Sequence, residues 1–125
     1  MRLVPAALAA AALAASAVSA VAAPARIDDS QFLTANRCLG LMTSHALGTP
    51  DAAAMQQFVK VQSWGRVGFI YDQADQARDD ARQAADHGGT DQRTQLTAER
   101  DGVCHAFLAS QTTTSSSRGD SRSIQ

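Results

Sequence analysis

The chain has 125 residues, with 11 Lys and Arg against 12 Asp and Glu, so its formal net charge is −1. A chain of this length fits one small domain with a thin core. Because it carries no basic field, the composition argues against a nucleic-acid-binding protein. The cations are nearly all Arg and the anions nearly all Asp, beside abundant Ala, a bias typical of a GC-rich bacterial genome.

An apolar segment, MRLVPAALAAAALAASAVSAVAA, occupies residues 1–23. A basic residue, an apolar run and a zone of small residues form the pattern of a cleavable signal peptide, with cleavage expected after Ala22 or Ala23. The alternative is a retained membrane anchor, but the run is mostly Ala and poor in Leu, Ile and Phe. We therefore expect an exported protein, periplasmic or extracellular, of about 102 residues with no stable membrane span after cleavage.

Helical spacing of apolar residues runs through residues 24–110, which we expect to form a single domain. The first helix has an N-cap among residues 28–30 and ends at Gly48. Its apolar stripe is Phe32, Ala35, Leu39, Met42 and Ala46. Thr49, Pro50 and Asp51 are typical of a new helix start. The apolar face of this second helix is Met55, Phe58, Val59 and Gln62.

Gly65 and Gly68 interrupt the second helix, where we expect a kink or a short break. A third helix follows and ends at Gly88 and Gly89; its stripe is Ala74, Ala77, Ala81 and Ala84. The last helix is capped by Thr90 or Asp91, runs to about Ser110, and places Leu96, Val103 and Phe107 inward with Cys104 beside them. No convincing strand signal competes, so the predicted fold class is all-α, a bundle of three helices, or four if the glycine break is complete.

The composition changes after Ser110, where residues 111–125 read QTTTSSSRGDSRSIQ. Such a polar segment buries too little surface to offset its ordering entropy, so it is predicted to be a disordered Ser/Thr-rich tail. Residues 118–121 spell RGDS and resemble the integrin-recognition motif. We favour a chance match, because short matches are common and a bacterial exported protein has no default reason to meet an integrin.

Cys38 and Cys104 lie near the middle of the first and last predicted helices. Disulfides persist outside the cytosol, so export favours a bond between these two residues over a pair of buried free thiols. An up-down-up bundle allows the Cα separation of roughly 5.5 Å that a disulfide needs. We therefore predict that a Cys38–Cys104 disulfide clamps the first helix to the last.

A haem or metal site is the alternative use of the same residues. Asp101-Gly-Val-Cys104-His105 resembles the c-type haem motif C-x-x-C-H with its first Cys replaced, as in helical cytochromes of the c′ class. The missing Cys and the outward direction of His105 argue against covalent haem. A zinc site from Cys38, His45, Cys104 and His105 needs four converging ligands, but two turns of helix separate Cys38 from His45. No cofactor or metal is therefore predicted.

Catalytic motifs are also missing: the sequence has no G-x-S-x-G, no H-E-x-x-H and no phosphate-binding glycine loop followed by Lys. The acidic cluster Asp72, Asp75, Asp79 and Asp80 is interleaved with Arg78 and Arg82, a pattern typical of surface ion pairs. No catalytic residue is nominated, and we expect a protein that is not an enzyme.

Two arginines, Arg66 and Arg100, fall within predicted apolar stripes. A buried Arg needs a partner, for which Glu99, Asp28 and Asp29 are candidates, whereas a surface Arg only covers apolar area with its stem. The list of residues predicted for an interaction surface is Trp64, Arg66 and Tyr71, types enriched at binding hot spots. We expect a small exported, non-catalytic binding protein, such as an inhibitor, a chaperone-like factor or an envelope accessory, with an unknown protein partner in the cell envelope. The alternative is a periplasmic haem- or metal-binding carrier that uses Cys104 and His105.

Overall fold

The first helix, α1 (Asp29–Met42), begins with a reciprocal cap. The Asp28 carboxylate accepts the backbone N–H of Gln31 at 2.8 Å, and the Gln31 side chain accepts the N–H of Asp28 at 3.2 Å. This capping box satisfies two N–H groups that have no partner inside the helix. The computed structural model of the protein describes residues 25–48 and 51–120, with side chains up to residue 113. The predicted signal peptide of residues 1–23 lies outside the described residues.

Helix α1 ends earlier than the sequence suggested. It stops at Met42, a short 3-10 turn η1 (His45–Leu47) follows, and Gly48 takes a φ of 84° that L side chains rarely adopt. The expected end at Gly48 was therefore wrong by one short element, and Ala46 is exposed instead of buried. Phe32, Ala35, Leu39 and Met42 are buried as predicted.

Helix α2 (Ala53–Ser63) buries Met55 and Gln62, while Phe58 and Val59 on the same face are half-buried. The predicted face is therefore confirmed. The start differs, because the first helical residue is Ala53 and the carboxylate of Asp51 accepts its N–H at 2.9 Å. Thr49 and Pro50, the predicted start, lie outside the described residues.

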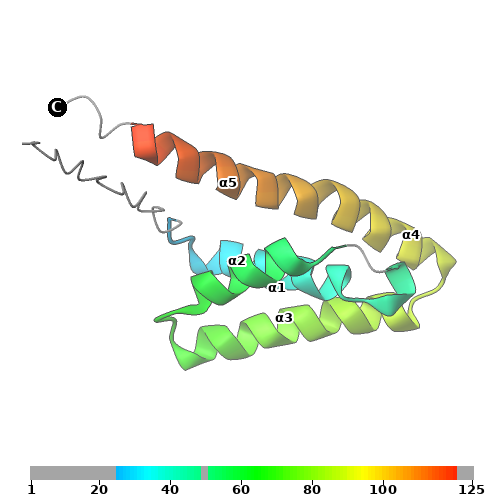
Figure 1. Cartoon of the computed structure of the whole chain (residues 1–125). Helices are drawn as coiled ribbons and strands as arrows, with labels where there is room; N and C mark the ends of the chain where they lie inside the picture. The colour runs from blue at the N-terminus through cyan, green and yellow to red at the C-terminus, as the bar shows by residue number, and fades with distance from the viewer. Residues whose placement is uncertain (1–24, 49–50, 121–125) are drawn as a thin grey trace, which may run out of the picture.

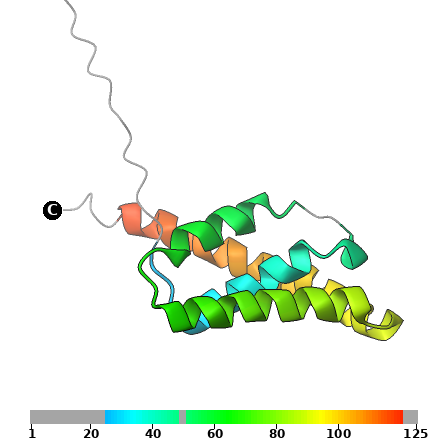
Figure 2. The ribbon, with the colours of Figure 1, turned by 90° about the horizontal axis from the view of Figure 1, so that it is seen from below.

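The glycine break between α2 and α3 (Gly68–His87) is complete. Gly65 has a φ of 72°, which reverses the chain after Trp64. In Figure 1 and Figure 2, α3 then runs alongside α1 for most of its length. Ala74, Ala81 and Ala85 are its buried residues, whereas Ala77 and Ala84 are half-buried, so the alanine stripe is rotated slightly from the predicted one.

Helices α1 and α3 approach each other closely at Gly40. A Cβ atom on Gly40 would lie 2.2 Å from the backbone oxygen of Arg78 and 3.1 Å from the Cβ of Ala81. Only the absence of a side chain allows the two backbones to pack at this distance. The small residues of both helices therefore set the spacing on which the rest of the bundle is built.

The last helical segment consists of α4 (Thr90–Glu99), a π-helical turn η2 (Arg100–Cys104) and α5 (His105–Asp120), which follow one another without a break. Gly89, one residue before the predicted caps, is the N-cap of α4. The π turn corrects one predicted inward residue. Leu96, Arg100 and Cys104 are buried, but Val103 is 59% exposed, because a π turn widens the helix and shifts the inward face.

The predicted all-α bundle is confirmed, with a Cys38–Cys104 disulfide between the first helix and the last helical segment. Among residues 25–48 and 51–120 no strand occurs, and none of the helices described there is long and apolar enough to cross a membrane. The main core consists of Ala35, Cys38, Leu39, Leu41, Met42, Leu47, Met55, Ala81, Ala85, Leu96 and Cys104.

The end of the last helix also differs from expectation. Helix α5 continues to Asp120, beyond the end expected near Ser110. The hydroxyls of Thr112 and Thr113 donate to the carbonyls of Leu108 and Ala109, both at 3.1 Å, a local bond that Thr can make within a helix. Disorder of the tail and the domain boundary at residue 110 stay predictions, and residues 121–125 lie outside the described part of the chain.

Candidate interaction surface at the α2–α3 connection

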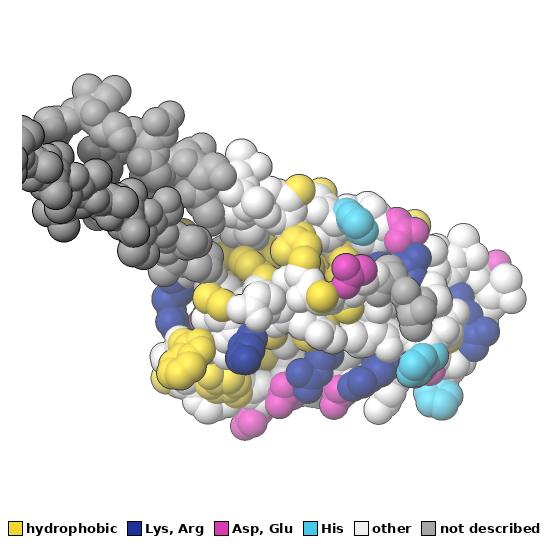
Figure 3. All heavy atoms as spheres, in the orientation of Figure 1, with side chains coloured by type: hydrophobic (Ala, Val, Ile, Leu, Met, Phe, Trp, Pro, Cys, Tyr) yellow, Lys and Arg dark blue, Asp and Glu magenta, His cyan; other side chains and the backbone are white. Residues whose placement is uncertain are grey.

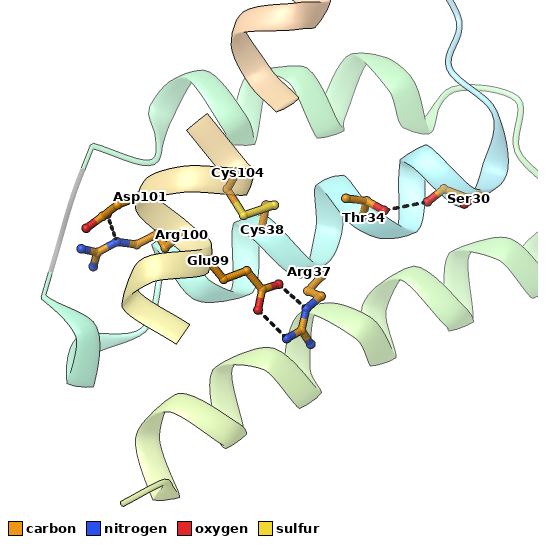
Figure 4. Close-up of a disulfide and its surroundings, with 8 residues drawn as sticks. All are labelled: Ser30, Thr34, Arg37, Cys38, Glu99, Arg100, Asp101 and Cys104. Atoms are coloured by element: carbon orange, nitrogen blue, oxygen red, sulfur yellow. Dashed lines mark hydrogen bonds and ion pairs between the residues drawn. A yellow bond between two sulfur atoms is a disulfide. The ribbon is translucent and has the colours of Figure 1, made fainter. Parts of the chain in front are cut away.

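The disulfide lies in the middle of the bundle, where it joins α1 to the π turn (Figure 4). The Cα atoms of Cys38 and Cys104 are 5.5 Å apart, and the two residues are 1% and 0% exposed. Because the sulfur of Cys104 is bonded to Cys38, it has no free thiol for a thioether bond to haem or for a metal ion. His105 is exposed on α5, so the two residues of the predicted carrier site do not form one.

A second link runs beside the disulfide. The guanidinium of Arg37 donates two hydrogen bonds to the Glu99 carboxylate, at 2.6 and 2.9 Å, as Figure 4 shows. Hydrogen bonding to Glu99 raises the pKa of Arg37. Glu99 is therefore the partner of Arg37, and neither Arg66 nor Arg100 uses it. This fork-to-fork pair fixes the rotation of α4 against α1.

The acidic residues of α3 form surface ion pairs, as expected from their spacing. Arg78 contacts Asp75 at 3.0 Å and Asp79 at 3.7 Å, and Arg82 contacts Asp79 at 2.5 Å. These side chains are between 32% and 61% exposed, and such pairs contribute little stability. The described residues contain no group of three or more His, Cys, Asp or Glu placed to hold a metal ion.

Arg66 points into the molecule, and its side chain is 1% exposed. Its guanidinium donates to the Asp29 carboxylate at 2.5 Å and to the carbonyls of Ile27 at 2.9 Å and Gln62 at 2.8 Å. It also lies 4.2 Å above the centre of the Phe32 ring, a cation–π contact. Arg66 therefore holds the α2–α3 connection against the start of α1. It was predicted as a surface residue, but burial removes it from any contact with a partner.

The residues on either side of Arg66 face outward. Trp64, Val67 and Phe69 are 75%, 67% and 68% exposed, and we name these three side chains the aromatic tip. In Figure 3, hydrophobic side chains gather at the end of the molecule where α2 joins α3, beside basic side chains. Val67 and Phe69 were not predicted to belong to a surface, since the sequence pattern gave them no direction. The short, glycine-flanked apolar run Val67-Gly-Phe-Ile-Tyr was the available signal.

Tyr71, the third predicted surface residue, lies at the base of the aromatic tip. Its hydroxyl donates to the carbonyl of Ser63, its ring packs edge-on against Phe32 with centroids 6.5 Å apart, and it is 36% exposed. Tyr71 therefore supports the connection from below. Of the predicted set, Trp64 alone presents most of its side chain to the surroundings.

The N-terminal strand of chain before α1 supports the same connection. The Gln62 side chain accepts the N–H of Ile27 at 3.1 Å and donates to the carbonyl of Ala25 at 2.9 Å. Arg26 donates to the carbonyl of Trp64 at 2.7 Å. The backbone that carries Trp64 is thus bonded to residues 25–27 on one side and to Arg66 on the other, so the aromatic tip stands on a rigid base.

Comparison with known proteins finds no family model, no curated protein and no solved structure that matches this chain. The functional argument accordingly depends on the geometry of the aromatic tip and its supports.

Proposed function

We propose that the protein is a small exported, non-catalytic binding protein of the cell envelope, and that the aromatic tip is its binding surface. The apolar segment 1–23 supports export, and the disulfide fits an oxidising compartment. The observation that carries the proposal is the exposure of three large apolar side chains on a braced connection. Single exposed apolar residues are ordinary, but adjacent ones on a rigid support are typical of a binding surface.

The geometry of Arg66 explains why this surface is preformed. Its bonds to Asp29, Ile27 and Gln62 fix the connection before any partner arrives. A partner then does not have to pay for ordering the backbone, which is a large cost when loops bind. The inhibitor, chaperone-like and accessory roles share this requirement for a fixed apolar contact.

A site-specific cross-link tests the proposal. A benzophenone amino acid in place of Val67 is expected to capture a defined envelope component under illumination of intact cells. The matched control carries the same group in place of Gln95, which is exposed on α4. Capture of the same components from both positions, or of none from position 67, would contradict the proposed surface.

A further inference from the structure

We propose that the aromatic tip docks on the surface of a phospholipid bilayer, with Trp64, Val67 and Phe69 inserted at the level of the headgroups. This inference rests on the proposed function and names the partner of the same surface. It describes a peripheral contact, without any segment of the helical domain crossing the membrane.

The shape of the tip fits a bilayer better than a protein partner. Three side chains project from one short connection at the end of the bundle, while Arg66, between them, points inward. Specific protein interfaces involve roughly 20–30 residues a side. A projecting tip needs no complementary pocket to enter a lipid interface, and Trp is enriched there because its ring is apolar and its N–H is polar.

Two exposed cations flank the tip at the depth expected for headgroup phosphates. Arg26 is bonded to the backbone of Trp64, and Lys60 occupies the last turn of α2. Asp72 is also exposed, one turn after Phe69, and partly offsets their charge. Insertion of the apolar side chains therefore supplies most of the affinity, and the dependence on lipid charge is modest.

The exit of the chain from the domain supports the same orientation. Ala25 follows the apolar segment 1–23 by one residue, and its carbonyl is bonded to Gln62 beside the tip. Figure 1 and Figure 2 both show the start of the described chain next to the α2–α3 connection. Before cleavage, a bilayer that holds residues 1–23 thus faces the aromatic tip. Afterwards the tip keeps the domain on that surface.

The only Trp of the chain makes the test direct, since Trp64 fluorescence reports on the tip alone. The purified mature protein, with its disulfide intact, is mixed with vesicles of phosphatidylcholine alone or with added phosphatidylglycerol. Insertion is expected to shift the Trp64 emission to the blue and to bring the protein down with both vesicles, a few times more strongly with the anionic one. An unchanged emission together with no co-sedimentation would overturn the inference, whatever happens to any variant.

A double variant, Trp64→Ser with Phe69→Ser, is expected to lower the vesicle partition coefficient at least about tenfold, because burial of each large apolar side chain contributes more than 1 kcal/mol. Val103→Ser removes an exposed apolar residue from the π turn and is the matched control, expected to bind as the parent does. Equal losses in both variants would refute the role of the tip. A protein cross-linked from position 67 without any vesicle binding would refute the lipid partner while supporting the proposed function.

Discussion

The two ends of the bundle bury an arginine each but present different exteriors. At one end, which carries the aromatic tip, Arg66 is bonded to Asp29 and to two backbone carbonyls. At the other, which we name the polar end, Arg100 donates to the carbonyl of Leu47 at 2.5 Å and to Asp101 at 2.7 Å. Both arginines fasten a turn to a distant part of the chain, because a small core leaves little apolar volume for that task.

Outside these arginines the ends diverge. The polar end is lined by His45, His87 and Arg93, all exposed, and Arg93 donates to the last carbonyls of α3 at Ala85 and Asp86. The same chain thus closes one end with polar side chains only. An aromatic exterior is therefore not a requirement of closing a helical connection in this bundle. This contrast is the reason to assign the exposed Trp64, Val67 and Phe69 to binding.

The largest expected effect comes from the disulfide, which lies between the two ends. Replacing Cys38 and Cys104 together by Ala is expected to lower the free energy of unfolding by about 4 kcal/mol, because the bond closes a loop of 66 positions. Urea unfolding at neutral pH measures the loss. Amide exchange is expected to rise at both ends together, since both depend on α1; a rise confined to one end would show that the ends are held independently.

A paired substitution compares the two arginines directly. Arg66→Met is expected to cost about 2–3 kcal/mol, because it strands the carbonyls of Ile27 and Gln62 and the Asp29 carboxylate, while Arg100→Met costs about 1 kcal/mol. Arg82→Met, which breaks only a surface pair, is the near-neutral control. Thermal or urea unfolding of the three variants provides the measurement. Equal losses at Arg66 and Arg100 would remove the energetic difference between the ends.

The smallest effect is a pH dependence at the polar end. A hydrogen bond from the Ser44 hydroxyl, at 2.7 Å, is the main cause that lowers the pKa of Asp86 below its ordinary value of 3.8. Folding therefore gains stability from this contact above that pH, and loses it as the pH falls through the lowered pKa. Ser44→Ala is expected to raise the Asp86 pKa, as read by carboxyl NMR titration, and to cost stability at neutral pH only.

Ser63→Ala is the control at the end that carries the aromatic tip, where the Ser63 hydroxyl donates to a backbone carbonyl and to no carboxylate. Its cost is expected to be the same in acid and at neutral pH. A Ser44→Ala loss that persists in acid would mean that the hydroxyl acts by packing, without any link to Asp86.

Much of the scaffold follows from local patterns in the sequence. The caps at Asp28, the glycine break and the alanine spacing of α3 are signals that a few neighbouring residues generate, and they were predicted. Pairing of Cys38 with Cys104 needed one further premise, an exported chain, because spacing alone does not distinguish a disulfide from two buried thiols.

The binding surface was only half predictable. Residue types pointed to Trp64, but the inward direction of Arg66 depends on carbonyls of residues 27 and 62, contacts that no local pattern reveals. The outward direction of Val67 and Phe69 follows from that of Arg66 and from the turn at Gly65. Direction at a break in a helix is set by tertiary contacts, so composition identified the region and missed the actual set of exposed side chains.

The π turn at Arg100–Cys104 has a consequence for how this sequence tolerates insertions and deletions. Removing one residue from this turn would restore ordinary helix and rotate everything that follows by about 100°, given 3.6 residues per turn. Cys104 would then leave the side of the helix that faces Cys38, and oxidation would join chains to one another instead of closing one chain. A single surplus residue in this turn thus decides whether the thiols of this protein meet within one molecule or between two.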